Sequence, residues 1–178
     1  IFIMDNFIAV GKRTLSMTVV ITTIAWAMGL SMLLMPLMAS AAVTGDLIKA
    51  SQPAVYYYGS DNKRYVFPNE GTYWSWYANF DAVKTITDGE LAAMPIGGNV
   101  TYKPGAKLLK ITTDPKVYAV AAGGTLRWVE TEAAAKALYG DAWATQVNDV
   151  PDAFFVNYSN TGAKISVAAD YDKAAVMA

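Results

Sequence analysis

The acidic side chains are the residues best suited to catalysis in this sequence. Two carboxylates held a few ångströms apart can hydrolyse a glycosidic bond. Three pairs lie close together along the chain: Glu130 with Glu132, Asp88 with Glu90, and Asp149 with Asp152. The first pair points to different faces of an expected helix, and the other two pairs lie at expected turns. Helix capping and solvated turns account for them equally well, so we predict that the chain is not an enzyme.

The composition excludes several other kinds of site. The chain has no cysteine and no histidine, which excludes thiol nucleophiles, Ser-His-Asp triads, zinc thiolates and disulfides. Asp170 and Asp172 come closest to a calcium cluster, but the Asp-x-Asp-x-Asp-Gly pattern is absent. With 14 basic and 15 acidic residues the net charge is −1, which argues against a nucleic-acid partner. We predict no metal and no cofactor.

Aromatic residues crowd the stretch from residue 56 to residue 80 and suggest contact with a glycan or a protein partner. Exposed rings stack on sugars, and strand alternation leaves Tyr56 and Tyr58 on one face. Trp74 is the helical ring left over for a ligand. Four other rings follow the spacing of a buried helix face, which favours core packing: Tyr73, Trp76, Tyr77 and Phe80. Both interpretations stay open.

Arg64 and Arg127 complete the candidate contacts, because they take similar places in the two halves of the chain. An arginine there can bind a carboxylate or phosphate of a wall polymer. Alternatively, its stem covers neighbouring aromatic rings and its head group stays in water.

The elements that position these residues form an internal duplication with a period of about 62 residues. Four segments match in order: Lys49 with Lys110, Pro53 with Pro115, Val55-Tyr56 with Val117-Tyr118, and Arg64-Tyr65-Val66 with Arg127-Trp128-Val129. Each copy predicts a strand, a hairpin, a helix, a short extended piece and a last short turn or helix. The fold class is therefore α+β, with two tandem hairpin-plus-helix repeats packed together over residues 43–100 and 101–160.

The predicted boundaries follow from local signals. Helices are expected at 69–80, 88–93 and 130–139, and the strands that open the two copies at 46–49 and 107–111. Thr87 with Glu90 forms a capping box, and Thr131 is an N-cap. Glycine, Asn and Asp mark the hairpin loops at 59–62 and 122–124. Residues 161–178 are expected to form a linker to a downstream region.

The first 42 residues have the features of an export signal. Lys12 and Arg13 precede residues 17–38, which carry no charge, and Ala39-Ser40-Ala41 fits a cleavage site. The apolar run is also long enough for a membrane anchor, so residues 1–42 are a signal peptide or an N-terminal hydrophobic helix left uncleaved. Either way the rest is exported, and membrane contact is limited to residues 17–38. A pilin-like filament subunit is a minor alternative, supported by Asp5 and opposed by Lys12 and Arg13.

Several motifs taken together resemble a known class of module. They are Leu-Ile-Lys, Val-Tyr-Tyr, Lys-Arg-Tyr-Val-Phe-Pro-Asn, the Tyr-x-x-Trp-Tyr helix, Leu-Arg-Trp-Val and Val-Pro-Asp-Ala-Phe-Phe. Over residues 45–160 the chain resembles the duplicated module next to the signal peptide in S-layer-like cell-surface proteins of small-genome bacteria. The resemblance implies a non-catalytic surface building block that packs against other copies or downstream domains. The alternative function is a cell-wall glycan-binding module that targets an appended domain.

Overall fold

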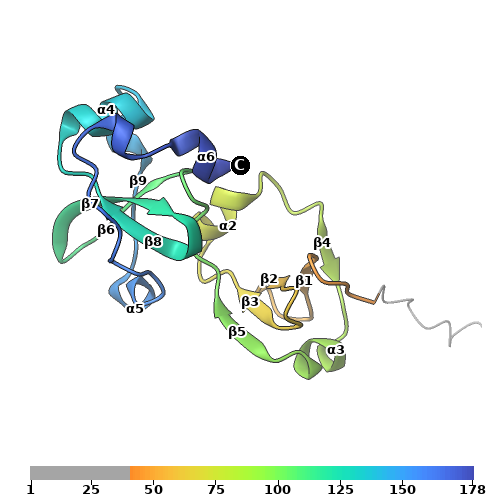
Figure 1. Ribbon diagram of the computed structural model, residues 1–178. Coiled ribbons are helices and arrows are strands. Elements are labelled where there is room, and N and C mark those ends of the chain that lie inside the picture. Colours follow the sequence, from red (N-terminus) through yellow and green to blue (C-terminus); the bar gives the residue numbers. More distant parts are fainter. Residues whose placement is uncertain (1–40) are drawn as a thin grey trace, which may run out of the picture. The chain divides into compact units, whose positions relative to one another are not determined.

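The computed structural model describes residues 41–178, which form an α+β fold with two mixed sheets (Figure 1). The predicted fold class is confirmed at this level. The predicted export segment at residues 17–38 lies outside the described residues. Among residues 41–178, every helix is too short or too polar to cross a bilayer.

The first sheet has five strands in the order β4-β1-β2-β3-β5. They are β1 (Leu47–Lys49), β2 (Tyr56–Tyr58), β3 (Arg64–Val66), β4 (Val83–Thr85) and β5 (Ile96–Asn99). β1, β2 and β3 pair in antiparallel fashion, whereas β4 lies parallel to β1 and β5 parallel to β3. Parallel neighbours need a crossover connection. Helices α2 (Glu70–Trp76) and α3 (Asp88–Ala93) lie in these connections.

The second sheet has four strands in the order β8-β7-β6-β9. They are β6 (Leu108–Ile111), β7 (Asp114–Ala121), β8 (Thr125–Trp128) and β9 (Val147–Asp149), joined through α4 (Glu132–Tyr139) and followed by α5 (Asp152–Phe155) and α6 (Lys173–Met177). β6 pairs antiparallel with β7 and parallel with β9, as β1 does with β2 and β4. Isolated parallel bridges to Ser159 and Ile165 lie on the β8 side, where β5 lies in the first sheet.

Local signals in the sequence explain where several elements begin and turn. Thr87 and Glu90 form the predicted capping box of α3, and the Thr131 hydroxyl accepts the Ala134 N–H at the start of α4. In the first hairpin loop Asn62 has a φ of 60°. Asparagine tolerates this left-handed conformation better than most residues, so a tight return from β2 to β3 is possible.

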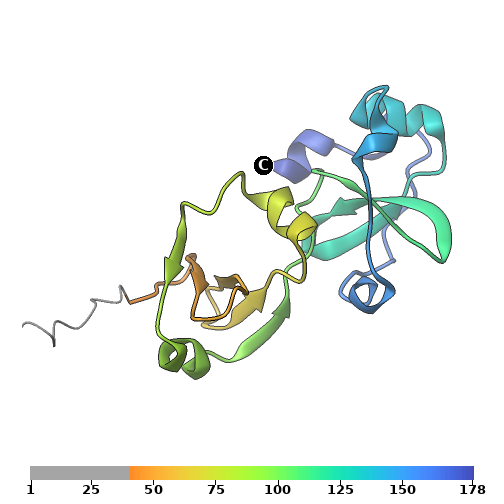
Figure 2. The same cartoon turned by 180° about the vertical axis from the view of Figure 1, so that it is seen from behind.

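Different segments of the chain pack against the two sheets. In the first sheet, Ile48 and Ala50 pack with Ile86 and Leu91 of the α3 side. In the second sheet, one face packs against α4 and the other against the region of α5. Both views show the chain passing from β5 directly into the second sheet (Figures 1 and 2).

Helix α2 is shorter than the predicted helix at 69–80. It ends at Trp76, and Tyr77 is extended with a φ of −129°. The buried Tyr73 ring stacks on Phe80 at 4.5 Å between centroids, and its hydroxyl donates to the Asn79 carbonyl at 2.7 Å. These contacts hold residues 77–80 in a bend back over the helix. As a result Phe80 covers Tyr73 without lying on the same helix face.

Residues 161–178 also differ from the prediction. The sequence suggests a polar, alanine-rich linker, but Ile165 and Tyr171 are buried in the core on the α4 face of the second sheet. Burial of these two large side chains outweighs the polar character of the residues around them. The segment is therefore part of the folded unit.

Candidate functional site

An aromatic pocket lies on the face of the first sheet opposite α3. Its volume is about 500 Å³. Five rings and three residues around the end of β5 line it: Tyr57, Tyr65, Phe67, Trp76, Tyr77, Asn99, Val100 and Thr101. None of these side chains carries a charge, so the pocket suits a neutral ligand with flat or apolar surfaces.

Strand register sets two of the rings side by side. Tyr57 lies opposite Leu47 on one neighbour and opposite Tyr65 on the other. Residues directly opposite each other in a ladder share a face of the sheet. Leu47 is buried, so the two tyrosines extend an apolar surface outward from the core.

The end of α2 provides a wall of the pocket. The Asn69 side chain accepts the Thr72 N–H at 2.8 Å and so fixes the first turn of the helix. At the other end, Trp76 Nε1–H donates to the Thr101 carbonyl at 2.8 Å, which orients the indole. Burial is the main cause that raises the pKa of Tyr77, with Tyr57 contributing. Its hydroxyl therefore stays neutral at physiological pH.

Tyr65 is held by a hydrogen bond and by a bulge in the neighbouring strand. Its hydroxyl donates to Asp61 Oδ2 at 2.7 Å, and this bond lowers the pKa of the Asp61 carboxyl and raises the pKa of Tyr65. β5 contains one extra residue between the partners of Arg64 and Tyr65. That residue is Gly97, where a Cβ would collide with the Tyr65 ring. A glycine is required for the ring to lie flat over the strand.

The arrangement of the pocket is suited to binding. Ring faces of tyrosine and tryptophan stack on other rings or on the apolar faces of sugars. The hydroxyls and the Asn99 amide supply donors and acceptors in the lining. We see no carboxylate or amine in the lining that could transfer a proton near neutral pH.

The tyrosines and the tryptophan predicted as ligand contacts lie outside this pocket. Trp74 is 45 % exposed on α2, where it contacts the rings of Tyr73 and Phe80. Tyr56 and Tyr58 are half-buried on the opposite face of the sheet, packed against the cluster around Ile48. The structure therefore does not bring the three predicted rings together into one platform.

Arg64 and Arg127 do not take equivalent places. Arg64 lies opposite Tyr58, and its guanidinium sits 5.2 Å from the Tyr56 ring centre, on the α3 face. Arg127 lies opposite Ala119 on the α4 face, and its Nε donates to the Ala163 carbonyl at 2.7 Å. Ala119 has Tyr57 as its counterpart in the first sheet, and the residue opposite Tyr57 is Tyr65. The similar spacing of the two arginines in sequence hides a shift of one residue.

The carboxylates considered for catalysis all have structural partners. Glu130 accepts from Ser166 and Lys164, and these bonds lower its pKa. The others are paired as follows: Glu132 with Lys136, Asp149 with Lys110, Asp88 with Ser51, Glu90 with Thr87, and Asp152 with Thr113. Residues 41–178 contain no group of three or more ligands that could hold a metal ion. Asp172 caps α6, and Asp170 accepts from backbone N–H groups.

A second hollow of about 380 Å³ lies beside Trp128 in the second sheet. The amines of Lys116 and Lys164 lie 5.3 and 4.9 Å from the centre of its ring, and Glu130 and Glu132 border it. Its charged groups already have partners: Glu130 pairs with Lys164, Glu132 with Lys136, and Lys116 with the indole. The aromatic pocket of the first sheet is therefore the better candidate.

Sequence reasoning missed the pocket because it assigned its rings to the core. Tyr57, Trp76 and Tyr77 lie close in sequence to the residues predicted as ligand contacts. The alternation along β2 also places Tyr57 and Tyr56 on opposite faces of the sheet. The pocket depends on strand pairing between segments that are separate in sequence: Leu47 pairs with Tyr57 across a turn, and Val66 pairs with Asn99 across α2, β4 and α3. No protein-family model, curated protein or solved structure matches this chain.

Proposed function

We propose that this chain is an exported, non-catalytic cell-surface module, S-layer-like, that packs against other copies or against further domains of a larger surface protein. We further propose that it is built from two tandem hairpin-plus-helix repeats. The uncharged run at residues 17–38 before Ala39-Ser40-Ala41 supports export, and the matching strand order of the two sheets supports the repeat architecture. β1 and β6 each pair antiparallel with the following strand and parallel with the strand that comes after α2 or α4, respectively.

Two further features support a structural role. The carboxylates considered for catalysis are engaged in caps, hydrogen bonds and ion pairs, so each of them already has a partner. The uncharged aromatic pocket offers an apolar contact surface of the kind enriched at protein interfaces.

The test is to express the 178-residue chain in a bacterium and to follow its location and assembly. We expect it in the envelope or the medium, and we expect chemical cross-linking to give homo-oligomers or adducts with surface proteins. A chain that stays in the cytoplasm, or that is exported but remains monomeric and uncross-linked at high density, would contradict the proposal.

A cell-wall glycan-binding module is the second candidate, favoured by the five rings of the pocket. In that case purified wall material should retain the chain. A Trp76→Ala chain should be released, while a Trp74→Ala chain stays bound, because Trp74 does not line the pocket.

A further inference from the structure

The counterpart of the aromatic pocket in the second sheet can be located by hydrogen-bond register. Leu47 pairs with Tyr57 as Leu108 pairs with Ala119. Val100 N–H donates to the Val66 carbonyl, and Ile165 N–H donates to the Trp128 carbonyl. Each bond joins the second strand of a hairpin, β3 or β8, to the segment beside it. Val100 therefore corresponds to Ile165.

The helices extend the same correspondence. α2 begins after Asn69 and α4 after Thr131, and each of these side chains accepts an N–H three residues on. Counting from the caps, Tyr77 of the pocket corresponds to Tyr139. The face that carries the pocket in the first sheet is thus the face with Ala119, Tyr139 and Ile165 in the second.

In the second sheet this position is filled by a tyrosine from the C-terminal segment. Tyr171 is 2 % exposed and packs in the cluster with Tyr139 and Ile165. Its hydroxyl donates to the Val120 carbonyl at 2.6 Å, and the Arg127 guanidinium lies 5.7 Å from its ring centre. The segment from Val167 to Met177 thus inserts one ring and continues as the short helix α6.

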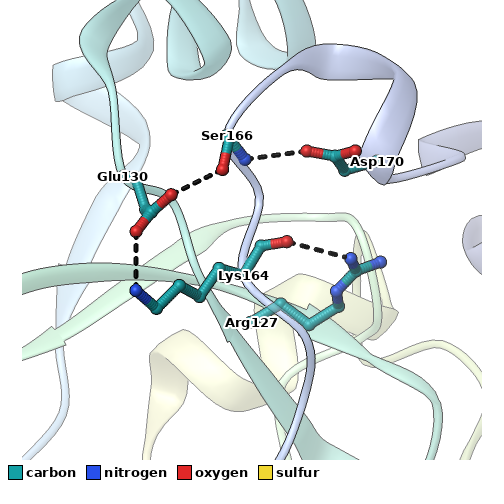
Figure 3. A network of polar contacts seen from close by, with 5 residues as sticks. All are labelled: Arg127, Glu130, Lys164, Ser166 and Asp170. Carbon is teal, nitrogen blue, oxygen red and sulfur yellow. Dashed lines mark hydrogen bonds and ion pairs between the residues drawn. The ribbon is translucent and has the colours of Figure 1, made fainter.

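A polar network holds this segment at the edge of the second sheet (Figure 3). Glu130 accepts from Lys164 at 2.9 Å and from the Ser166 hydroxyl, and Ser166 N–H donates to Asp170 at 2.8 Å. Arg127 donates to the Lys164 carbonyl at 3.3 Å. These bonds set the backbone just before Tyr171, so the ring enters at a defined place.

Among residues 41–178, no segment fills the corresponding place in the first sheet. After Val100 the chain turns away, and Tyr102 enters the core on the α5 side of the second sheet. The place corresponding to Tyr171 is the open pocket of about 500 Å³. A corresponding acceptor is also present. The Tyr58 carbonyl accepts Gly45 N–H as the Val120 carbonyl accepts Gly105 N–H, and a carbonyl can accept a second bond.

We propose that the aromatic pocket binds a tyrosine-bearing peptide segment of a partner chain, with the ring inserted as Tyr171 is in the second sheet. The inference rests on the proposed function and names the partner chemistry of its contact surface. A peptide is favoured over a sugar because the corresponding site of the same chain already holds a tyrosine. In the pocket, Tyr57 and Tyr65 take the places that Ala119 and Arg127 have in the second sheet. The incoming ring therefore meets ring faces instead of a guanidinium.

The test uses the full 178-residue chain in mild detergent and a fluorescent peptide with the sequence of residues 166–178. Anisotropy should show saturable binding that weakens about tenfold or more when the peptide carries Tyr171→Ala. Trp76→Ala in the protein should have a similar effect, because that indole lines the pocket. Trp74→Ala is the matched control on the same helix and should change the affinity less than about twofold.

Several outcomes would overturn the inference. One is no binding; a second is binding that survives Trp76→Ala, since the peptide would then be exchanging into the second sheet. A third is a pocket that takes wall oligosaccharides in a Trp76-dependent way and ignores the peptide. If circular dichroism shows that Trp76→Ala does not fold, Tyr57→Leu replaces it with the same expectation. Cross-linked assembly without peptide binding would leave the proposed function standing and remove only this inference.

Discussion

At the scale of single residues, Tyr171 combines an apolar and a polar role. Its ring is buried among Tyr139, Ile165 and Leu108, and its hydroxyl reaches the Val120 carbonyl at 2.6 Å. The Val120 carbonyl also accepts Gly105 N–H at 3.0 Å. It therefore keeps a partner if the hydroxyl is removed.

Two substitutions separate these roles. Tyr171→Ala leaves a cavity and should lower the free energy of unfolding by about 3–5 kcal/mol. Tyr171→Phe keeps the ring, loses one hydrogen bond and should cost about 1 kcal/mol. Urea unfolding of both variants checks the difference. Equal losses would mean that the ring contributes nothing beyond its hydroxyl bond.

At the scale of elements, short helices depend on their first turn. α2 has seven residues, too few for stability on its own. Its N-cap, Asn69, accepts Thr72 N–H, and the other end of the helix supplies Trp76 to the pocket. The cap therefore acts on the pocket through the helix.

Asn69→Ala should lower the free energy of unfolding by about 1 kcal/mol. It should also weaken ligand binding at the pocket, because Trp76 loses part of its support. Thr131→Ala removes the corresponding cap of α4 and is the control. It should cost a similar free energy and leave pocket binding unchanged. Denaturant curves with peptide or glycan titrations measure both effects.

The elements were predictable from the sequence to different degrees. Caps and turns depend on neighbouring residues, so the Thr87–Glu90 capping box and the Thr131 cap were predicted correctly. Arg64 and Arg127 were aligned by side-chain type, whereas strand pairing offsets them by one residue and so puts them on opposite faces. The pocket depends on that register and could not be predicted from local patterns.

At the scale of the whole molecule, residues near the pocket are also bonded to the second sheet. Tyr102 follows the pocket residue Thr101, and the Asn148 amide donates to its hydroxyl at 3.0 Å. Gly71 of α2 faces the same hydroxyl so closely that a Cβ there would collide with it. Residues 101 and 102 thus connect the pocket with the second sheet.

The titratable groups predict a broad stability plateau. The chain has no histidine or cysteine, so no side chain with an ordinary pKa titrates between about pH 5 and 9. Hydrogen bonds from Ser166 and then Lys164 lower the pKa of Glu130, and backbone bonds from Val167 and Ser166 lower that of Asp170. Their contribution is present above their unfolded pKa values and is lost as the pH falls through the lower folded values.

Tyrosines set the alkaline limit with the opposite sign. Burial raises the pKa of Tyr158 from 10.0 to about 12. Its contribution is present below the unfolded pKa and is lost as the pH rises toward the folded one. The melting temperature should therefore be flat from about pH 5 to 9 and fall on both sides. A step near pH 6 or 7 in a thermal scan would contradict this account.

The position of Tyr171 along the chain has a consequence for biosynthesis. The strands of the first sheet all lie within residues 47–99, but the core on the α4 face of the second sheet includes Ile165 and Tyr171. A chain that emerges N-terminus first, from a ribosome or a translocation channel, completes the first sheet while the second still exposes Leu108 and Ala119. During that interval the exposed face is a site for a chaperone, or for premature capture by the Tyr171 segment of a neighbouring nascent chain.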